Sequence, residues 1–349
     1  MKSTKIYKED IKNVLCNIPN IDKLKGKRVL ITGATGLICS AIADILFELN
    51  QSGFGIEIVL AGRNANNLNK RFEDYIDGKD YSFLLYDATS NNNEGNLKID
   101  YVIHGASNAD PAKIIDEPVE TILANVQGLN SLMSMLDKSN IERLLYISSS
   151  EVYGINETME PYKEDQLGYI DILNVRSSYP NSKRVTETMC IAYSEEYNID
   201  TVIVRPGHIY GPTIKLSDSR ASAVFSINAA RGEEIVMKSK GAQLRSYCHV
   251  LDCASAIIAV HLNGQRGQAY NISSSKSIVT IKEMAEAFAE AGNVSITYDI
   301  PTESETRSYN MMSCSALNSE KLEALGWKAE FDMKTGADHT IKMLKNRLW

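Results

Sequence analysis

Two side chains four residues apart, Tyr179 and Lys183 in the stretch YPNSK, could carry out acid–base chemistry. On a helix, this spacing places a phenol and an ammonium group on one face. A free tyrosine has a pKa of about 10 and is a poor base at neutral pH, but a neighbouring cation favours the phenolate and lowers that pKa. The spacing is common by chance, and its position after a fifth strand and before a helix favours a catalytic role.

A second polar cluster follows the strand expected at Leu144–Ser148. The run SSSEVYG presents hydroxyls and a carboxylate, with Ser149, Ser150 and Glu151 at its centre. Serine runs usually form caps or turns. In a doubly wound sheet, however, the carboxyl ends of the strands form the edge that binds ligands. Because the chain also has the Tyr179/Lys183 pair, we interpret this run as part of the same site.

A glycine-rich turn, TGATGLIC (Thr32 to Cys39), follows an expected strand and opens an expected helix. Glycine suits both the tight turn and the close approach of the backbone to a pyrophosphate. The N–H groups at the helix N-terminus also favour phosphate. The third position of the pattern is Cys39 instead of glycine, and there the need is for close helix–strand packing, which a small side chain can satisfy. The turn predicts dinucleotide binding through Gly33, Thr35, Gly36, Leu37 and Ile38.

The end of the second expected strand bears on the choice between NAD and NADP. An acidic residue there binds the ribose 2′-hydroxyl, whereas an arginine accommodates a 2′-phosphate. This sequence has Arg63 there and no acid, so we expect NAD(P) with NADP(H) preferred; the alternative is that Arg63 is a solvated surface charge. His104 is expected to be a packed residue at a strand end. Further cofactor contacts are expected after the third and fourth strands, from Asp87, Ala88, Gly105, Ala106 and Ser107.

These motifs require a scaffold of alternating strands and helices. Strands are predicted at Lys27–Thr32, Glu57–Ala61, Leu84–Tyr86, Tyr101–His104, Leu144–Ser148 and Thr201–Arg205, and helices at Ala41–Asn50, Val119–Leu136 and Asn181–Tyr197. Such alternation implies an α/β fold with a parallel, doubly wound sheet of the Rossmann type.

The length of 349 residues is typical of about two folding units or of one large α/β domain. We expect an N-terminal helical extension over residues 1–26 and a dinucleotide-binding Rossmann domain over 27–212. After Pro212 the alternation weakens, with helices expected within 217–232 and at 281–291. Residues 213–349 are therefore expected to form mainly a smaller substrate lobe, with part of the chain returning to the Rossmann domain.

Composition narrows the possible partners. With 44% hydrophobic and 23% charged residues, the chain is neither disordered nor collagen-like. A formal charge of −7 argues against nucleic acid, although a local basic pocket can still bind an anionic substrate. The charged N-terminus is no secretory signal, and no stretch approaches the roughly 20 apolar residues of a membrane span. The six scattered cysteines suggest no metal cage, so we expect a cytoplasmic protein with reduced thiols and without a metal.

Four segments together resemble the extended short-chain dehydrogenase/reductases that modify nucleotide-sugars. They are TGATGLIC, SSSEVYG, the Tyr179/Lys183 pair and RPGHIYGP (Arg205–Pro212). The resemblance extends from Lys27 to the C-terminus. It implies a nucleotide-diphosphate-linked sugar or polyol as substrate, hydride transfer from the sugar 4-position to the nicotinamide, and a homodimer.

The resemblance also implies a role for each matching residue. Tyr179 matches the base that takes the proton from a sugar hydroxyl, Lys183 the residue that lowers its pKa and holds the nicotinamide ribose, and Ser149 the hydroxyl that bonds the same sugar oxygen. Asn125, in ANVQG, matches an asparagine that supports the hydrogen-bond network, and Pro206 is expected beside the cofactor. The expected substrate contacts are Ser107, Arg176, His208, Arg220 and Arg245. For Arg176 and Arg220 the alternative is an exposed, solvated arginine.

The acid at position 151 narrows the reaction. Ser149-Ser150-Glu151 is similar to the Thr-Ser-Glu of GDP-mannose 4,6-dehydratases and UDP-glucuronate decarboxylases, and the stretch from Arg176 onward looks decarboxylase-like. This implies oxidation of the sugar followed by loss of water or carbon dioxide. The sequence departs from the pattern at Arg63, Cys39 and His208. At the position of His208, the family usually has asparagine. An NADP(H)-dependent net reductase of a keto-sugar or keto-polyol nucleotide, an epimerase and a non-catalytic dinucleotide sensor are the alternatives.

Overall fold

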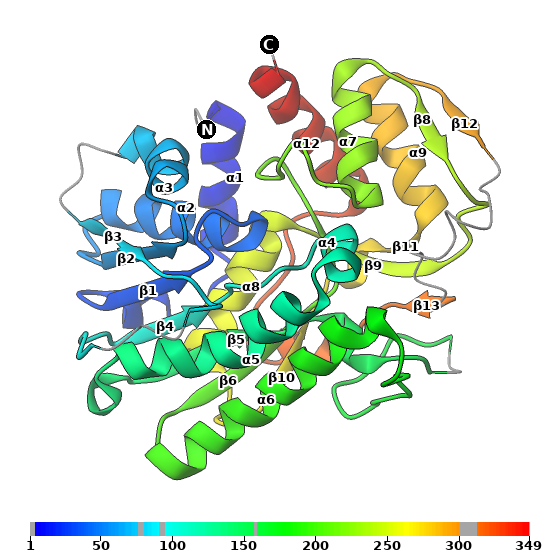
Figure 1. Cartoon of the computed structure of the whole chain (residues 1–349). Coiled ribbons are helices and arrows are strands. Elements are labelled where there is room, and N and C mark those ends of the chain that lie inside the picture. The colour runs from blue at the N-terminus through cyan, green and yellow to red at the C-terminus, as the bar shows by residue number, and fades with distance from the viewer. Residues whose placement is uncertain (1–3, 76–79, 91–94, 157–158, 300–312, 349) are drawn as a thin grey trace.

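The structure is a computed structural model and describes residues 4–75, 80–90, 95–156, 159–299 and 313–348. Its centre is a seven-stranded sheet in the order β10-β6-β5-β4-β1-β2-β3, in which all neighbouring strands are parallel (Figure 1). The strands are β1 (Arg28–Thr32), β2 (Glu57–Gly62), β3 (Tyr81–Leu85), β4 (Tyr101–His104), β5 (Arg143–Ile147), β6 (Thr201–Pro206) and β10 (Ala269–Ile272). The strand order reverses beside β1, so the predicted Rossmann-type fold is confirmed.

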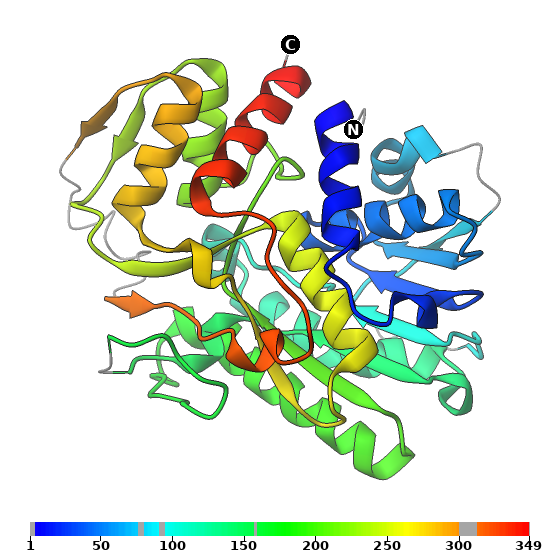
Figure 2. The same ribbon diagram turned by 180° about the vertical axis from the view of Figure 1, so that it is seen from behind.

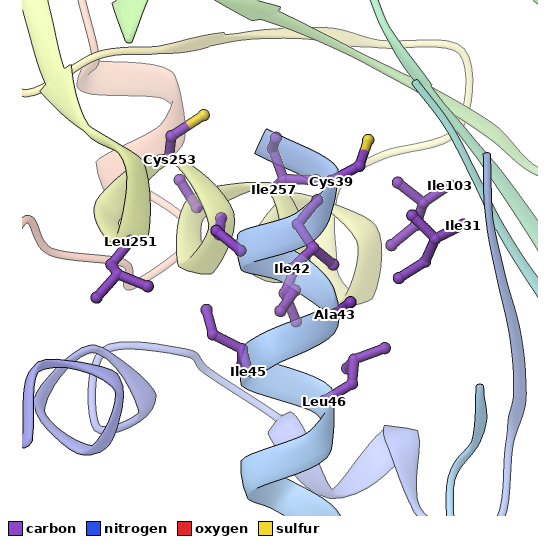
Figure 3. Close-up of a cluster of buried hydrophobic side chains, with 14 of the residues drawn as sticks. Ile31, Cys39, Ile42, Ala43, Ile45, Leu46, Ile103, Leu251, Cys253 and Ile257 are labelled. Atoms are coloured by element: carbon purple, nitrogen blue, oxygen red, sulfur yellow. The ribbon is translucent and has the colours of Figure 1, made fainter. Parts of the chain in front are cut away.

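Apolar strands covered on both faces explain why this sheet forms. Along β1, Val29 and Ile31 join one buried cluster, whereas Leu30 joins a second cluster on the opposite face. The first cluster lies against α1 (Lys5–Leu15), α2 (Leu37–Gln51) and α8 (Val250–Asn263), and Figure 3 shows α2 and α8 packed together there. The second lies against α5 (Pro118–Met135) and α6 (Ser178–Tyr197).

Short strands that the sequence did not predict follow β6. A four-stranded sheet contains β7 (His208–Tyr210), β9 (Leu244–His249), β11 (Ile278–Thr280) and β13 (Cys314–Ser315), and β8 (Ile235–Met237) pairs with β12 (Ile296–Tyr298). Most of these strands are only two or three residues long, which is too short for a hydrophobic period to be recognised. Together with α7 (Ala221–Arg231), α9 (Ile281–Gly292) and α12 (Met333–Leu348), all of these strands except β13 contribute side chains to a third buried cluster or pack against it.

The two ends of the described chain lie together. In Figure 2, α1 and α12 are neighbours, and the His339 ring nitrogen Nδ1 lies 3.0 Å from the Asp10 carboxylate.

The remaining helical elements are α3 (Ala65–Phe72), α4 (Pro111–Asp116), α11 (Glu320–Glu323), and the 3-10 helices η1 (Ile21–Leu24), η2 (Glu73–Tyr75), η3 (Lys138–Asn140), η4 (Ser150–Tyr153), η5 (Val175–Ser177) and η6 (Ser275–Ser277). No helix in the described part of the chain has the length and apolar character that a membrane crossing requires.

Candidate active site

The glycine-rich turn connects the end of β1 to α2. Gly33 has a φ of +68°, and a Cβ there would lie 2.8 Å from the Gly105 carbonyl oxygen, so only glycine fits. Gly36 is the N-cap of α2, which therefore begins four residues earlier than predicted. The first N–H groups of a helix have no partner inside it, so the turn offers donors to an anion at the carboxyl edge of the sheet.

The cysteine in place of the third glycine is accommodated by the neighbouring strand end. Cys39 is buried on α2 (Figure 3). A Cβ at Gly105 would lie 2.3 Å from the Cys39 sulfur. The close packing therefore depends on glycine at position 105. Thr32 fixes this region, because its Oγ1 accepts hydrogen bonds from the Gly105 and Ala106 backbones, both at 3.1 Å, and lies 2.8 Å from His104 Nδ1. Burial lowers the pKa of His104 to about 3, so this packed histidine is neutral.

A chain of hydrogen bonds links the loop after β4 to the start of α6. Ser107 Oγ donates to Asn125 Oδ1 at 2.9 Å, and Asn125 Nδ2 donates to Ser182 Oγ at 3.0 Å. Ser182 Oγ donates in turn to the Tyr179 carbonyl oxygen at 2.8 Å. Asn125 is fully buried in α5, where an unpaired amide would be costly, so this network fixes how α5 and α6 meet. Sequence analysis identified Asn125 but missed Ser182.

Tyr179 and Lys183 lie in the first turns of α6, which begins three residues earlier than predicted. Both side chains are buried, with 6% and 2% of their surfaces exposed. Lys183 Nζ donates to the Ile147 carbonyl oxygen at 2.8 Å and lies 4.7 Å from the centre of the Tyr146 ring and 5.7 Å from that of Tyr179. Burial lowers the pKa of Lys183 to about 7.

Ser149 and Glu151 approach the Tyr179 phenol from the turn after β5. Ser149 lies close enough to the phenol to lower its pKa, and its Oγ accepts from the Glu151 backbone N–H at 3.2 Å. Burial first, and then the Glu151 charge, raise the pKa of Tyr179 to about 12, opposed by the Ser149 hydroxyl and by two arginines, Arg176 and Arg220. The lowered pKa that we expected from a neighbouring cation is therefore not observed here, because burial outweighs every group that lowers it.

Two predicted substrate contacts are held by carboxylates of the chain itself. Arg176 Nη1 and Nη2 donate to the two oxygens of Glu151 at 2.8 and 2.7 Å. Arg220 Nε donates to Asp218 Oδ1 at 2.9 Å, and its Nη2 donates to Oδ2 at 2.5 Å. The alternative of exposed, solvated arginines is wrong, because both side chains are partly buried in fork-shaped ion pairs.

The other predicted substrate contacts lie on β7 and β9. His208 pairs with Tyr247 across the two strands, with ring centres 5.5 Å apart, and burial lowers the pKa of His208 to about 3. Arg245 is 3% exposed, and its Nη1 donates to the Leu244 carbonyl oxygen at 2.9 Å. Pro206 ends β6 and is buried beside β10.

The predicted adenosine-side residues follow β2 and β3. Arg63 is exposed directly after β2, and Ala88 is buried. Asp87 accepts hydrogen bonds from the Thr89 N–H at 3.0 Å and from its hydroxyl at 2.9 Å. The Thr89 N–H, the Thr89 hydroxyl and the Arg63 charge lower the pKa of Asp87. In the described ranges, no three His, Cys, Asp or Glu side chains gather in a way that would hold a metal ion.

Two residues that secure the turn after β5 were not predicted from the sequence. Arg184 Nε donates to the Val152 carbonyl oxygen and Nη2 donates to that of Gly168, both at 2.8 Å. Gly154 has a φ of +66°, and a Cβ there would lie 2.4 Å from the Tyr169 carbonyl oxygen. The SSSEVYG motif itself was the signal for Gly154, whereas no spacing identifies Arg184.

Comparisons with known proteins identify the family of the chain. The NAD dependent epimerase/dehydratase family model matches residues 29–273. The chain is similar to UDP-glucuronic acid decarboxylase 3 of Arabidopsis thaliana, with 28% identity over 313 residues, 88% of this chain and 86% of that protein.

Two solved structures share the fold. The UDP-glucose 4-epimerase of Thermotoga maritima with UDP-glucose is 20% identical with a TM-score of 0.75, covering 92% of this chain and 100% of that one. The dTDP-glucose 4,6-dehydratase of Bacillus anthracis with NAD is 21% identical with a TM-score of 0.74, covering 93% and 98%. With the family model matching well over half of its length, the chain belongs to the NAD dependent epimerase/dehydratase family and is an NAD(P)-dependent enzyme.

Proposed function

We propose that this enzyme oxidises the sugar of a nucleotide-diphosphate-linked substrate at carbon 4 and then eliminates carbon dioxide or water from it. The observation that carries the proposal is that the turn after β5, which packs against α6, places the Ser149 hydroxyl and the Glu151 carboxylate beside the buried Tyr179. A carboxylate beside an acid–base pair supplies the second proton-transfer group that an elimination needs. The similarity to a UDP-glucuronic acid decarboxylase supports the proposal.

The residues of the chain divide the proton transfers between them. Tyr179 takes the proton of the 4-hydroxyl while Ser149 holds the same oxygen. A ketone at carbon 4 makes the proton on carbon 5 acidic and makes a carboxylate attached there labile. In loss of water, Glu151 takes the carbon-5 proton and the hydroxyl leaves from carbon 6. In loss of carbon dioxide, the bond between carbons 5 and 6 breaks, the ketone holds its electron pair as an enolate, and Glu151 delivers a proton to carbon 5.

The described residues fit a bound dinucleotide. Gly33 and the N-terminus of α2 suit the pyrophosphate, because a Cβ at position 33 would block the turn and the helix begins directly after Gly36. The buried Lys183 suits the nicotinamide ribose. A bound nicotinamide would supply reversible hydride transfer: the hydride from carbon 4 would go back to carbon 4 after loss of carbon dioxide, or to carbon 6 after loss of water, so turnover would consume no added reductant.

We propose a preference for NADP(H), which rests on Arg63. It is exposed after β2, where the chain has no carboxylate to repel a 2′-phosphate. Calorimetry on protein stripped of cofactor should give tighter binding of NADP+ than of NAD+, and Arg63→Ala should reduce that preference about tenfold. Equal affinities in the wild type would contradict the preference. Lys70→Ala, in the neighbouring helix α3, is the control for a general loss of surface charge.

An anionic substrate requires two internal ion pairs to open. Arg176 is paired with Glu151 and Arg220 with Asp218, so each guanidinium already holds a carboxylate where a substrate anion would bind. Release of Glu151 from Arg176 would also free the carboxylate that the elimination needs. This coupling predicts that nucleotide-sugars with a carboxylate on carbon 5 compete for Arg176.

A panel of nucleotide-sugars tests the function. Purified protein without added cofactor should convert a member of the panel to a product lighter by carbon dioxide or water, as measured by mass spectrometry. Tyr179→Phe should lose this turnover and retain cofactor binding. The absence of any mass change across the panel would refute the elimination and favour a dinucleotide sensor, whereas a fully active Tyr179→Phe would refute the role of Tyr179 as the base.

A net NADP(H)-dependent reductase is the second candidate, and Arg63 is the observation that favours it. A reductase would consume NADPH in equal amount with a nucleotide-linked keto-sugar or keto-polyol. Loss of absorbance at the nicotinamide band on addition of such a substrate would identify this reaction. Turnover with catalytic amounts of cofactor would exclude it.

We also propose a homodimer formed through α5 and α6. Five apolar or aromatic side chains are exposed on these packed helices: Val119, Ile122 and Leu123 on α5, and Val185 and Tyr197 on α6. Apolar patches of this kind commonly mark protein interfaces. Sedimentation should give twice the chain mass of 38.7 kDa, and Val185→Asp should give the monomer. Ile172→Asp, at a 77% exposed position outside these helices, is the matched control. A wild-type monomer would contradict the proposal.

We propose a cytoplasmic location as well. All six cysteines are unpaired and five of them are buried, which agrees with a reducing compartment. Cell fractionation with an antibody to the chain would test this, and recovery in a membrane or secreted fraction would contradict it.

A further inference from the structure

A buried ion pair lies one helical turn behind Lys183. Arg205, at the end of β6, donates from Nε and Nη2 to the two oxygens of Glu187 at 3.0 and 2.7 Å. The Arg205 and Glu187 side chains are only 7% and 12% exposed. Glu187 follows Lys183 by four residues on α6, so the two side chains share a helix face.

The pair is continuous with a wider buried network. Arg205 Nη1 donates to the Tyr153 hydroxyl at 3.1 Å and to the Glu164 carbonyl oxygen at 2.7 Å. The Tyr153 hydroxyl donates to Asn271 Oδ1, on β10, at 2.6 Å. The Glu187 carboxylate is therefore fixed by contacts that reach from α6 across β6 to β10, and it is held at one place relative to Lys183.

We propose that Glu187, fixed by Arg205, is a positioning residue that keeps the Lys183 ammonium charged inside the apolar site. The proposal rests on the proposed function, in which a charged Lys183 holds the cofactor ribose. Both oxygens of Glu187 accept hydrogen bonds from Arg205, whereas Lys183 Nζ donates to the Ile147 carbonyl oxygen. The carboxylate therefore acts on Lys183 through its charge.

The balance of forces around Lys183 explains why such a carboxylate is needed. Lys183 is 2% exposed, and burial removes the water that would stabilise an ammonium group. Burial is the largest influence on its pKa and lowers it, and the Glu187 charge is the largest of those that raise it. The other titratable side chains that face Lys183 carry no charge in their protonated thiol or phenol form or, for the histidine, as neutral imidazole. They are Cys39 on α2, His104 on β4, Tyr146 on β5, and Tyr179 and Cys190 on α6.

Removal of the charge at position 187 should shift the titration of Lys183. In Glu187→Gln the midpoint should fall by about 1 pH unit, because the loss of a nearby opposite charge disfavours the ammonium. Glu187→Asp retains the charge and should titrate close to the wild type. Tyr153→Phe breaks two bonds of the network but removes no charge, so it should also leave the midpoint unchanged.

The test is an NMR titration of lysine labelled with 13C at Cε in the full-length protein, with the Lys183 signal assigned by its loss in Lys183→Met. This reads Lys183 directly and needs no substrate, so it stays informative if no nucleotide-sugar turns over. A folded Glu187→Gln with the wild-type midpoint would overturn the proposal. If that variant fails to fold, Glu187→Met with Arg205→Met leaves no unpaired charge and should still lower the midpoint; an unchanged or raised midpoint there would overturn it equally.

Discussion

The cofactor side and the substrate side of the candidate site are built in different ways. On the cofactor side, Thr32, Asn125 and Ser182 join strand ends and helices through hydrogen bonds that are complete within the chain. On the substrate side, Arg176 and Arg220 are held by the chain's own carboxylates. Under the proposed function, this difference means that the cofactor side is preorganised, whereas the substrate side would exchange internal ion pairs for ligand contacts.

The largest effect should follow from disturbing the preorganised side at Gly33. Gly33→Ala places a Cβ 2.8 Å from the Gly105 carbonyl oxygen in a backbone with a φ of +68°. We expect cofactor affinity to fall about 100-fold, as measured by calorimetry, because the turn must move. Gly53 also has a positive φ, of +81°, but nothing lies within 4 Å of its Cβ position, so Gly53→Ala is the control for backbone strain alone. Wild-type affinity in Gly33→Ala would contradict a preorganised turn.

A moderate effect is expected at the contact between Gly105 and Cys39. Gly105→Ala would place a Cβ 2.3 Å from the Cys39 sulfur and should lower the free energy of unfolding by about 2 kcal/mol. Cys39→Gly removes that sulfur, so the alanine should be tolerated much better in the double variant. Denaturant unfolding of the two single variants and the double variant measures this coupling, and additive losses would show that the two residues do not share the space.

The smallest of the three effects concerns the substrate side and the pH dependence of turnover. Arg176 lowers the pKa of Tyr179 and Glu151 raises it. Arg176→Gln should therefore move the pH at which the phenolate forms upward, and Glu151→Gln should move it downward, each by up to about 1 unit. Because the base acts as phenolate, the rise of activity with pH should occur at a higher pH in Arg176→Gln than in the wild type. Arg176→Lys retains the charge and serves as the control.

The readout for the Glu151 variant is the tyrosinate absorbance of the protein, compared with Tyr179→Phe, because Glu151→Gln is also expected to slow the elimination. Shifts of the same sign in both variants would contradict the opposed action of this ion pair on Tyr179.

The cofactor side was also the more predictable from sequence. The turn at Thr32–Cys39 and the buried strands have local patterns, because backbone geometry and two-sided burial restrict which residues fit. The helix of Tyr179 was predicted, but its first turn was not, since Pro180 obscures where α6 begins.

The substrate side depends on contacts between segments far apart in the chain. Arg176 meets Glu151 across 25 positions, and no periodicity records such a pair. The three-residue strand β7 and the six-residue strand β9 were missed as well, because they are defined by their partners and not by their own sequence. The pKa of Tyr179 was predicted with the wrong sign, since its sequence neighbours do not reveal how deeply it is buried.

The most direct test of the account is the mass of the product formed in deuterium oxide. A nucleotide-sugar that the enzyme oxidises at carbon 4 and then changes by elimination must take up a solvent proton at carbon, so we predict a product that has lost carbon dioxide or water and carries one carbon-bound deuteron. Glu151→Gln should form this product far more slowly, while its cofactor affinity stays near that of the wild type. A product of unchanged composition without carbon-bound deuterium would contradict the elimination and indicate an epimerase.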